Sequence, residues 1–108
     1  AGALPLWLSP VQARVIPVSQ QFDEYAKRTA ERFKEAGIRA EADLRNEKMG
    51  YKIRAAQLEK IPYMLIVGEK EAGSDTVSVR KRGEGDVGAK PVDEAIGLML
   101  EEIRTRKV

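Results

Sequence analysis

Cysteine and histidine are both absent from the 108-residue sequence. Without cysteine, the chain has no disulfide, no thiol nucleophile and no thiolate ligand for zinc. Without histidine, it lacks the side chain most used for proton transfer near neutral pH, which is also the commonest metal ligand. Carboxylates, lysine and tyrosine remain available for catalysis, but the sequence as a whole disfavours a self-contained enzyme.

Long apolar runs and a strong excess of one charge are missing as well. No stretch approaches the roughly 18 apolar residues of a membrane-spanning helix, and the N-terminus has no signal-peptide pattern, so we expect no membrane partner. Nineteen basic and seventeen acidic residues give a net charge of only +2. Total charge is therefore weak support for nucleic-acid binding, and the placement of the charges carries more weight.

The length is that of one domain, and 43% apolar with 33% charged residues is usual for a globular protein. Residues 1–12 are apolar and contain Pro5 and Pro10, which keep the residues before them out of a helix. We interpret this stretch as an extended lead-in, the remnant of a linker from a preceding domain. Residues 13–108 then form the domain itself.

Hydrophobic periodicity predicts alternating strands and helices. Strands are expected at residues 13–18, 38–42, 61–67, 76–82 and 88–90. Helices are expected at residues 20–36 with Gly37 as the C-cap glycine, at 49–60, and from Pro91 onward. This order predicts a three-layer α/β domain with a mixed, mostly parallel sheet, in which the short loop at 68–75 precedes an antiparallel strand.

A dense polar turn follows the second predicted strand. Its polar members are Asp43, Arg45, Asn46, Glu47 and Lys48. A buried core does not require so much charge at this point. Ligands of open α/β sheets collect beyond the carboxyl ends of the parallel strands, and the loop at 69–71 follows the third such strand. We therefore expect this turn, that loop and part of the strand at 76–82 to converge on one surface.

The residue types at this surface suit an unpaired RNA base. A carboxylate such as Glu71 can accept hydrogen bonds from the Watson–Crick edge of guanine, and Arg80 can donate to its O6 or N7. Asn46 can both donate and accept, which suits a base with a mixed pattern. Nearby basic side chains would contact phosphates and fix position instead of sequence. These are Lys48, Lys52, Arg54 and Lys60.

Each of these features also has a purely structural interpretation. Asp43 and Arg45 can form an ordinary surface ion pair, and Asn46 can cap a turn. The basic run at 80–82 can be a solvated strand end that prevents edge-to-edge pairing. The glycine-rich stretch at 83–88 carries acids and does not open into a helix, so it does not predict a dinucleotide site.

Four motifs resemble a known family. They are LPLWLSPVQ at residues 4–12, AGIRAEADLRNEKMGYKIR at 36–54, IPYMLIVGEKE at 61–71 and VSVRKRGEGDVG at 77–88. With them the chain resembles the C-terminal anticodon-binding domain of class II aminoacyl-tRNA synthetases, most closely that of the threonyl-tRNA synthetases. The fold that this resemblance implies is a mixed five-stranded sheet flanked by three helices.

The resemblance implies an RNA-binding module without catalysis of its own. The expected ligand is the anticodon stem-loop of threonine tRNA, read at its second and third anticodon bases, G and U. By motif match, the residues that would read these bases are Asn46, Glu71 and Arg80. The residues expected to contact the RNA backbone are Arg45, Lys48, Lys52, Arg54, Lys60 and Arg82.

The same resemblance places the remaining machinery outside this chain. ATP and zinc are expected in the catalytic domain of a full-length, cytoplasmic enzyme, and no cofactor is expected here. Residues 1–12 would lead in from that catalytic domain, and residues 13–108 would be the anticodon-binding domain. The full-length enzyme is expected to be a homodimer, largely through its catalytic domains, which leaves a monomer open for this chain.

Two other functions compete with this one. A synthetase-like paralogue or accessory subunit would use the fold for protein or RNA interaction without reading anticodons. It would be expected to lack Asn46, Glu71 or Arg80, yet all three are present. A small α/β enzyme or ligand binder would need a pocket with a perturbed acid–base pair, and the sequence offers none.

Overall fold

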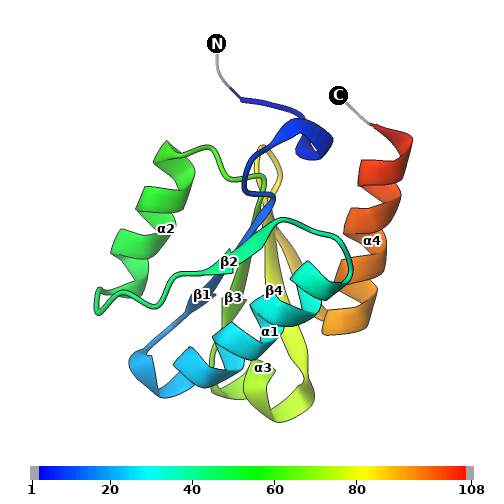
Figure 1. Ribbon diagram of the computed structural model, residues 1–108. Helices are drawn as coiled ribbons and strands as arrows, with labels where there is room; N and C mark the ends of the chain where they lie inside the picture. Colours follow the sequence, from blue (N-terminus) through cyan, green and yellow to red (C-terminus); the bar gives the residue numbers. More distant parts are fainter. Residues whose placement is uncertain (1–2, 107–108) are drawn as a thin grey trace.

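A central five-stranded sheet organises the chain (Figure 1). A computed structural model describes residues 3–106, and its strands lie in the order β2-β1-β3-β4-β5. The strands are β1 (Ala13–Pro17), β2 (Ala40–Ala42), β3 (Tyr63–Val67), β4 (Thr76–Lys81) and β5 (Gly85–Pro91). β1 pairs in parallel with β2 and β3, whereas β4 and β5 add to the sheet antiparallel. The predicted mixed sheet is confirmed.

Within residues 3–106, four α-helices and two 3₁₀-helices connect the strands. They are η1 (Leu6–Leu8), η2 (Gln20–Phe22), α1 (Asp23–Glu35), α2 (Met49–Leu58), α3 (Glu69–Ser74) and α4 (Val92–Thr105). Three flanking helices were predicted, and α3 adds a fourth inside the loop expected at 68–75. None of the helices in this part of the chain combines the length and apolar character that crossing a membrane requires.

The end of α1 shows how local sequence sets an element boundary. Gly37 takes a φ of +98°, and its N–H donates to the carbonyl of Lys34 at 2.9 Å. The next N–H, that of Ile38, donates to the carbonyl of Phe33 at 3.0 Å. This pair of hydrogen bonds is the Schellman motif, so the predicted C-cap glycine is confirmed.

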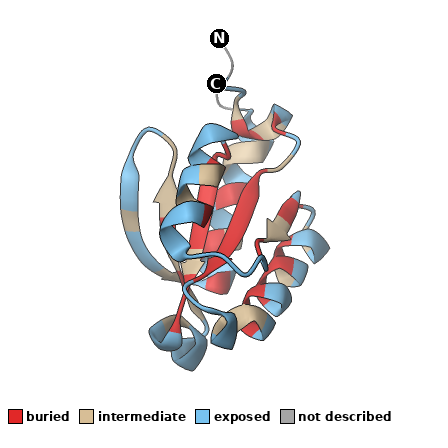
Figure 2. Cartoon of the chain, turned by 90° about the vertical axis from the view of Figure 1, so that its left-hand side faces the viewer, coloured by how far each residue is buried: buried red, intermediate tan, exposed pale blue. Residues whose placement is uncertain are grey.

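The main core lies between one face of the sheet and the helices α1 and α4. Leu65 of β3 and Val77 of β4 point into it and are fully buried. Phe33 of α1 and Met99 of α4 pack into the same cluster, with at most 1% of their surface exposed. Figure 2 shows this layering, because the central strands are buried while the outer sides of the helices are exposed.

The opposite face of the sheet carries a smaller core beneath α2. It consists of Ile16 of β1, Ala56 of α2, Met64 of β3 and Ile61, which lies just before β3. α2 packs on β1, and toward β4 the face is less covered, because Ser78 and Arg80 remain partly exposed there. As its alternating sequence predicts, β4 has an apolar side in the main core and a polar side on the α2 face.

Residues 4–12 pack against the domain. Leu6 is 3% exposed and belongs to the main core, and the buried side chain of Gln12 donates to its carbonyl at 3.0 Å. The predicted extended conformation is wrong for Leu6–Leu8, which form η1. Pro5 is compatible with this turn because it occupies the N-cap, where no intrahelical hydrogen bond needs its N–H.

Candidate nucleic-acid interface

Arg80 lies at the centre of the candidate site, on the partly open face of β4. It pairs with Met64 of β3 in the sheet. Its guanidinium has no hydrogen-bond or ion-pair partner within residues 3–106. Arg28 and Arg54 share this property, but both are exposed on helices. Among the arginines of this part of the chain, Arg80 is therefore the one that is both partly buried and available to an external ligand.

A pocket of about 200 Å³ lies beside Arg80. Met64 contributes an apolar surface to its lining, and Gln57 and Lys60 contribute polar groups at the end of α2 and in the loop that follows. Gly83 and Gly85 of the β4–β5 turn form another wall without side chains. A lining with an apolar surface and a few hydrogen-bonding groups suits a flat heterocycle, whose faces are apolar and whose edges are polar.

Glu71 lies in the first turn of α3, beyond the carboxyl end of β3. Its Oε1 accepts a hydrogen bond from the backbone N–H of Gly68 at 2.8 Å. Glu71 thus caps the N-terminus of α3 from the N3 position, whereas the N-cap residue, Gly68, has no side chain to complete a capping box. The second carboxylate oxygen has no hydrogen-bond partner among the described residues. The cap holds the carboxylate in place and leaves one oxygen able to accept an N–H from a base.

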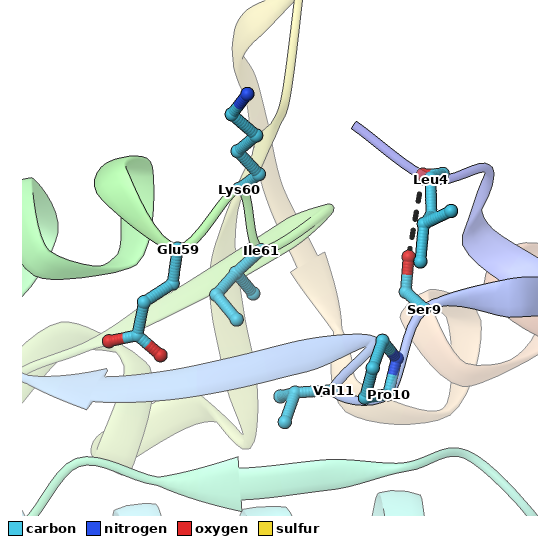
Figure 3. Close-up of a pocket in the computed structure, with 7 residues that line it drawn as sticks. All are labelled: Leu4, Ser9, Pro10, Val11, Glu59, Lys60 and Ile61. Atoms are coloured by element: carbon cyan, nitrogen blue, oxygen red, sulfur yellow. Dashed lines mark hydrogen bonds between the residues drawn. The ribbon is translucent and has the colours of Figure 1, made fainter. Parts of the chain in front are cut away.

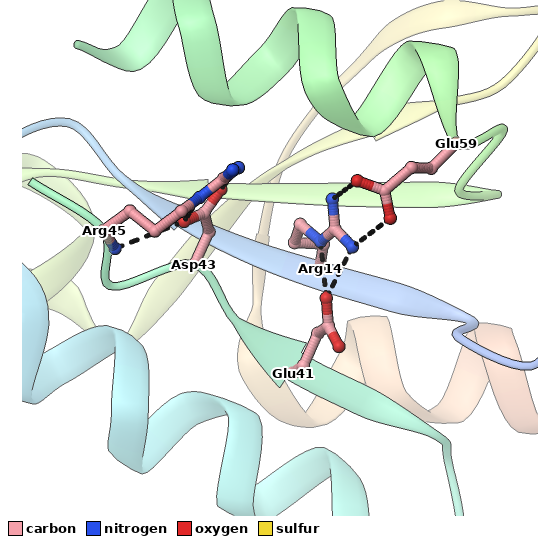
Figure 4. A network of polar contacts seen from close by, with 5 residues as sticks. All are labelled: Arg14, Glu41, Asp43, Arg45 and Glu59. Atoms are coloured by element: carbon pink, nitrogen blue, oxygen red, sulfur yellow. Dashed lines mark hydrogen bonds and ion pairs between the residues drawn. The ribbon is translucent and has the colours of Figure 1, made fainter. Parts of the chain in front are cut away.

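An ion pair between Asp43 and Arg45 holds the polar turn after β2 (Figure 4). Arg45 Nε and Nη2 donate to the two Asp43 carboxylate oxygens at 2.9 and 2.7 Å. These hydrogen bonds lower the pKa of Asp43, and the charge of Lys52 adds to the effect. The Asp43 side chain is only 4% exposed. The ion pair that the sequence offered as a structural alternative is therefore present.

Asn46 is presented by this turn. Its side chain is exposed and makes no hydrogen bond within the described part of the chain. The N-cap position of α2 is occupied by Lys48 instead, so the interpretation of Asn46 as a capping residue is wrong. Its carboxamide consequently keeps both its donors and its acceptor for a ligand.

The three candidate base readers do not meet at one point. Asn46 follows β2 and Glu71 follows β3. Because β1 lies between these two strands, the strands are about 10 Å apart. Arg80 is paired with Met64, three residues before the end of β3. Arg80 therefore lies about 10 Å along the strand from the end that Glu71 follows. The expected common surface is thus extended, and different nucleotides would contact different residues on it.

The prediction that Lys52 contacts phosphate is contradicted by the structure. Lys52 is 1% exposed, on the inward side of α2, and its charge lies near the buried carboxylate of Asp43. It cannot meet an RNA phosphate from there. Lys48 and Arg54, in contrast, are exposed at the N-cap and on the surface of α2, so both remain able to contact phosphates.

Arg82 makes hydrogen bonds that connect separate segments of the domain. Its Nη1 and Nη2 donate to the carbonyls of Lys60 and Leu4, each at 2.6 Å. This arrangement joins β4 to the α2–β3 loop and to the lead-in. The expected contact between Arg82 and RNA is therefore not supported by its geometry, because its two terminal nitrogens already have protein acceptors. Lys60 is exposed and lines the pocket beside Arg80.

No sequence pattern indicated the charge network around the buried side chain of Arg14 (Figure 4). Arg14 Nε donates to Glu41 at 2.7 Å and its Nη2 to Glu59 at 2.8 Å. The hydrogen bond with Glu59 is the main cause of a raised pKa for Arg14. Because its side chain is 7% exposed, Arg14 supports the packing of α2 and β2 on β1 and is not a ligand contact.

A second pocket, of about 190 Å³, separates the lead-in from the end of α2 (Figure 3). It is lined by Leu4, Ser9, Pro10, Val11, Glu59, Lys60 and Ile61. Glu59 already binds Arg14, so the pocket contains no carboxylate reserved for proton transfer. Within residues 3–106, no group of three or more acidic residues is placed to hold a metal ion.

Comparisons with known proteins indicate an anticodon-binding domain. A family model described as an anticodon binding domain matches residues 12–102. The chain is 52% identical over 105 residues to the threonine–tRNA ligase of Syntrophomonas wolfei, covering 97% of this chain. It is 55% identical over 106 residues to that of Caldanaerobacter subterraneus subsp. tengcongensis, covering 98% of this chain. The chain spans 16% of the length of each of these curated relatives.

A solved structure agrees with this result. The RNA-binding domain of threonyl-tRNA synthetase from Cryptosporidium parvum superimposes with a TM-score of 0.88 at 33% sequence identity. The match covers 94% of this chain and 26% of that chain. The resemblance inferred from the four motifs and the predicted α/β fold are both confirmed.

Proposed function

The chain belongs to the family of anticodon-binding domains, and from this we propose that it is the RNA-recognition domain of a threonine–tRNA ligase. Its ligand is the anticodon stem-loop of threonine tRNA. It reads the second and third anticodon bases, G and U, so that the full-length enzyme attaches threonine to the matching tRNA. The similarity to threonine–tRNA ligases over nearly the whole chain supports this choice of amino acid.

The observation that carries the proposal is the partnerless, partly buried guanidinium of Arg80. A buried or half-buried arginine normally has an acceptor, as Arg14 and Arg82 do here. Arg80 instead lines a pocket that contains Met64 and a glycine turn. A guanine base would supply the missing acceptors through its O6 and N7.

Asn46 and Glu71 supply the remaining hydrogen-bonding groups of the proposed site. The bound and oriented carboxylate of Glu71 accepts N–H groups from a base, and the exposed amide of Asn46 both donates and accepts. Lys48, Arg54 and Lys60 are exposed basic residues near this surface, and the side chain of Arg45 is 48% exposed. These four would contact the RNA backbone and contribute affinity that does not depend on sequence.

The chemistry of aminoacylation belongs to another part of the proposed enzyme. This chain contributes no catalytic residue, and ATP and zinc would bind in the catalytic domain. Residues 1–12 would connect to that domain and residues 13–108 would bind the RNA. The full-length enzyme is proposed to be a cytoplasmic homodimer.

The proposal is tested by measuring binding of this chain to two RNA hairpins by fluorescence anisotropy. One is a threonine anticodon stem-loop, and the other is a copy with the middle G of the anticodon changed to A. Measurements at two salt concentrations separate base reading from phosphate attraction, because only the latter weakens steeply with salt for both RNAs. We expect a preference for the G-containing loop that persists at the higher salt concentration.

Two results would contradict the proposal. Equal binding of both hairpins that disappears with salt would show a basic surface without base reading. Absence of binding to either hairpin would show that the fold of this chain serves another purpose. The Arg80→Ala variant is the internal control, because it removes the proposed guanine contact while leaving the exposed lysines in place.

A further inference from the structure

An exposed aromatic ring lies beside the turn that carries Asn46. Tyr51, in the first turn of α2, is 52% exposed. The guanidinium carbon of Arg45 lies 5.3 Å from the centre of its ring, which is the geometry of a cation–π contact. The guanidinium lies over one face of the ring, and both side chains are about half exposed. Together they present a cationic and aromatic surface next to the turn that carries Asn46.

This surface is held in a fixed position. The two hydrogen bonds from Arg45 to Asp43 prevent free rotation of the guanidinium, and the Arg45 backbone N–H also donates to Asp43 at 3.3 Å. Asp43 itself is buried against the sheet. An exposed arginine would ordinarily lose much side-chain entropy on binding a ligand, and this restraint reduces that loss.

Tyr51 lies on the outer, exposed side of α2. Tyr51, Arg54 and Leu58 recur at helical spacing on one stripe, and all three are exposed. The inward side of the same helix is occupied by Lys52 and Ala56. Tyr51 therefore presents about half of its surface to solvent on the same side of α2 as Arg54.

We propose that Arg45 and Tyr51 form a stacking site for one unpaired nucleobase of the RNA loop. The inference rests on the proposed function and extends it, because neither residue reads a base edge. Unstacked bases bind proteins by stacking on aromatic rings and on arginine planes. A base placed on this pair would fix the neighbouring nucleotide next to Asn46, whose amide is one residue away in sequence from Arg45. Stacking of this kind tolerates any base.

The competing explanation is that the pair only stabilises the turn. It predicts that loss of the ring lowers the stability of the domain and affects all RNAs equally. The stacking site predicts a loss of affinity that depends on one particular base of the loop. The two explanations are therefore separated by removing the base as well as the ring.

The experiment combines Tyr51→Leu with a set of threonine anticodon stem-loops in which each loop nucleotide in turn is abasic. Binding to the unmodified loop is expected to weaken roughly five- to 150-fold in Tyr51→Leu, and to stay near wild type in Tyr51→Phe. At one loop position, the abasic RNA should bind wild type more weakly than the intact loop does. Tyr51→Leu, in contrast, should bind this abasic RNA and the intact loop equally well. Leu58→Ala, on the same stripe, is the control and should change binding little.

A second measurement does not depend on the variant. 2-Aminopurine placed at the sensitive position should lose fluorescence on binding wild type, as it does when stacked. Additive losses from Tyr51→Leu and from every abasic position would overturn the stacking site. If Arg80→Ala abolished base discrimination while Tyr51→Leu bound normally, the stacking site would be wrong and the anticodon-reading function would stand. Failure of wild type to bind any hairpin would overturn both proposals.

Discussion

Individual arginines in this domain differ in role because they differ in partners. Arg14 is held by two glutamates, Arg82 by two backbone carbonyls and Arg45 by Asp43. Arg80 has no such partner in the described part of the chain. A side chain without an internal acceptor can change its hydrogen bonding when a ligand arrives without breaking the fold, which is what recognition of a base requires.

Arg80→Ala should reduce discrimination between RNA loops more than it reduces stability. We expect the free-energy difference between the cognate loop and the G-to-A loop to shrink by about 1–3 kcal/mol, the scale of one good base contact. The measurement is a pair of binding isotherms for each variant. Arg28→Ala, which removes an equally partnerless arginine from α1, should leave discrimination unchanged. Unaltered discrimination in Arg80→Ala would rule this residue out as a base reader.

Asp43 should make the stability of the domain depend on acid pH. Hydrogen bonds from Arg45 lower its pKa in the folded state, whereas in the unfolded chain it titrates near the ordinary aspartate value of about 4. The stabilisation from the charged carboxylate is therefore complete above about pH 4, and it is lost as the pH falls through the lowered folded-state pKa.

Asp43→Asn should consequently destabilise the domain at neutral pH by about 1–2 kcal/mol. This difference from wild type should shrink when unfolding by urea is repeated near pH 3, since Asp43 is then largely protonated in the unfolded wild-type chain, which stabilises the unfolded state. Glu47→Gln changes an exposed carboxylate of the same turn and should have little effect at either pH. A difference between Asp43→Asn and wild type that stayed constant with pH would show that the ion pair does not stabilise the fold.

The location of a charged side chain is the property that sequence reasoning handled least well. Lys52 looked like one of several exposed lysines because α2 has no clean apolar stripe, yet it is among the most buried side chains of the domain. Arg82 belonged to a basic run that suggested a solvated strand end, but its acceptors come from Leu4 and Lys60, which are far away in sequence. Periodicity describes which face a residue occupies and not which distant carbonyl it meets.

The secondary-structure elements themselves followed local signals where those signals were strong. The helix at 20–36 was predicted from its apolar stripe, and α1 with η2 fills most of that range. α3 was missed because a six-residue helix has no repeat to detect, and because Gly68 at its N-cap has no side chain that would complete a capping box with Glu71 at N3. β5 is longer than the predicted 88–90 because its pairing with β4 includes a register shift after Val79, which no alternating pattern encodes.

Two glycines at helix positions should respond to alanine in opposite directions. Gly37→Ala should destabilise the domain by about 1 kcal/mol, because a φ of +98° is unfavourable for a residue with a Cβ even though nothing obstructs that atom. Gly97→Ala should stabilise by about 0.5–1 kcal/mol, because Gly97 lies inside α4 and has open space around its Cβ position. Thermal unfolding of both variants measures the two effects, and a loss of stability in Gly97→Ala would contradict this account.

At the scale of the whole molecule, the lead-in is part of the folded unit. Arg39 donates to the carbonyls of Ser9 and Trp7 at 3.0 and 3.1 Å, and the guanidinium carbon of Arg106 lies 5.0 Å from the centre of the Trp7 ring. With Arg82, these contacts join residues 4–9 to β4, to the segment before β2 and to the end of α4. An element connected in this way is expected to move together with the sheet that carries the proposed RNA-binding face.

Whether the lead-in and the rest of the domain unfold together can be tested with two leucines of η1. Leu6 is 3% exposed and Leu8 is 48% exposed, so Leu6→Ala should cost about 2–4 kcal/mol through loss of a buried side chain, whereas Leu8→Ala should change stability by less than about 0.5 kcal/mol. Urea unfolding can be followed by the fluorescence of Trp7, the only tryptophan, and by circular dichroism of the whole chain.

If the lead-in and the sheet unfold together, both signals will have the same midpoint in wild type, and Leu6→Ala will shift the two midpoints equally. A fluorescence transition at lower urea than the circular dichroism transition would show that residues 4–9 detach first. In that case Leu6→Ala should move only the fluorescence signal. Coincident midpoints would instead mean that residues 4–9 are rigidly coupled to the sheet. RNA binding at the proposed Arg80 site and a force on the lead-in would then act on one cooperative structure.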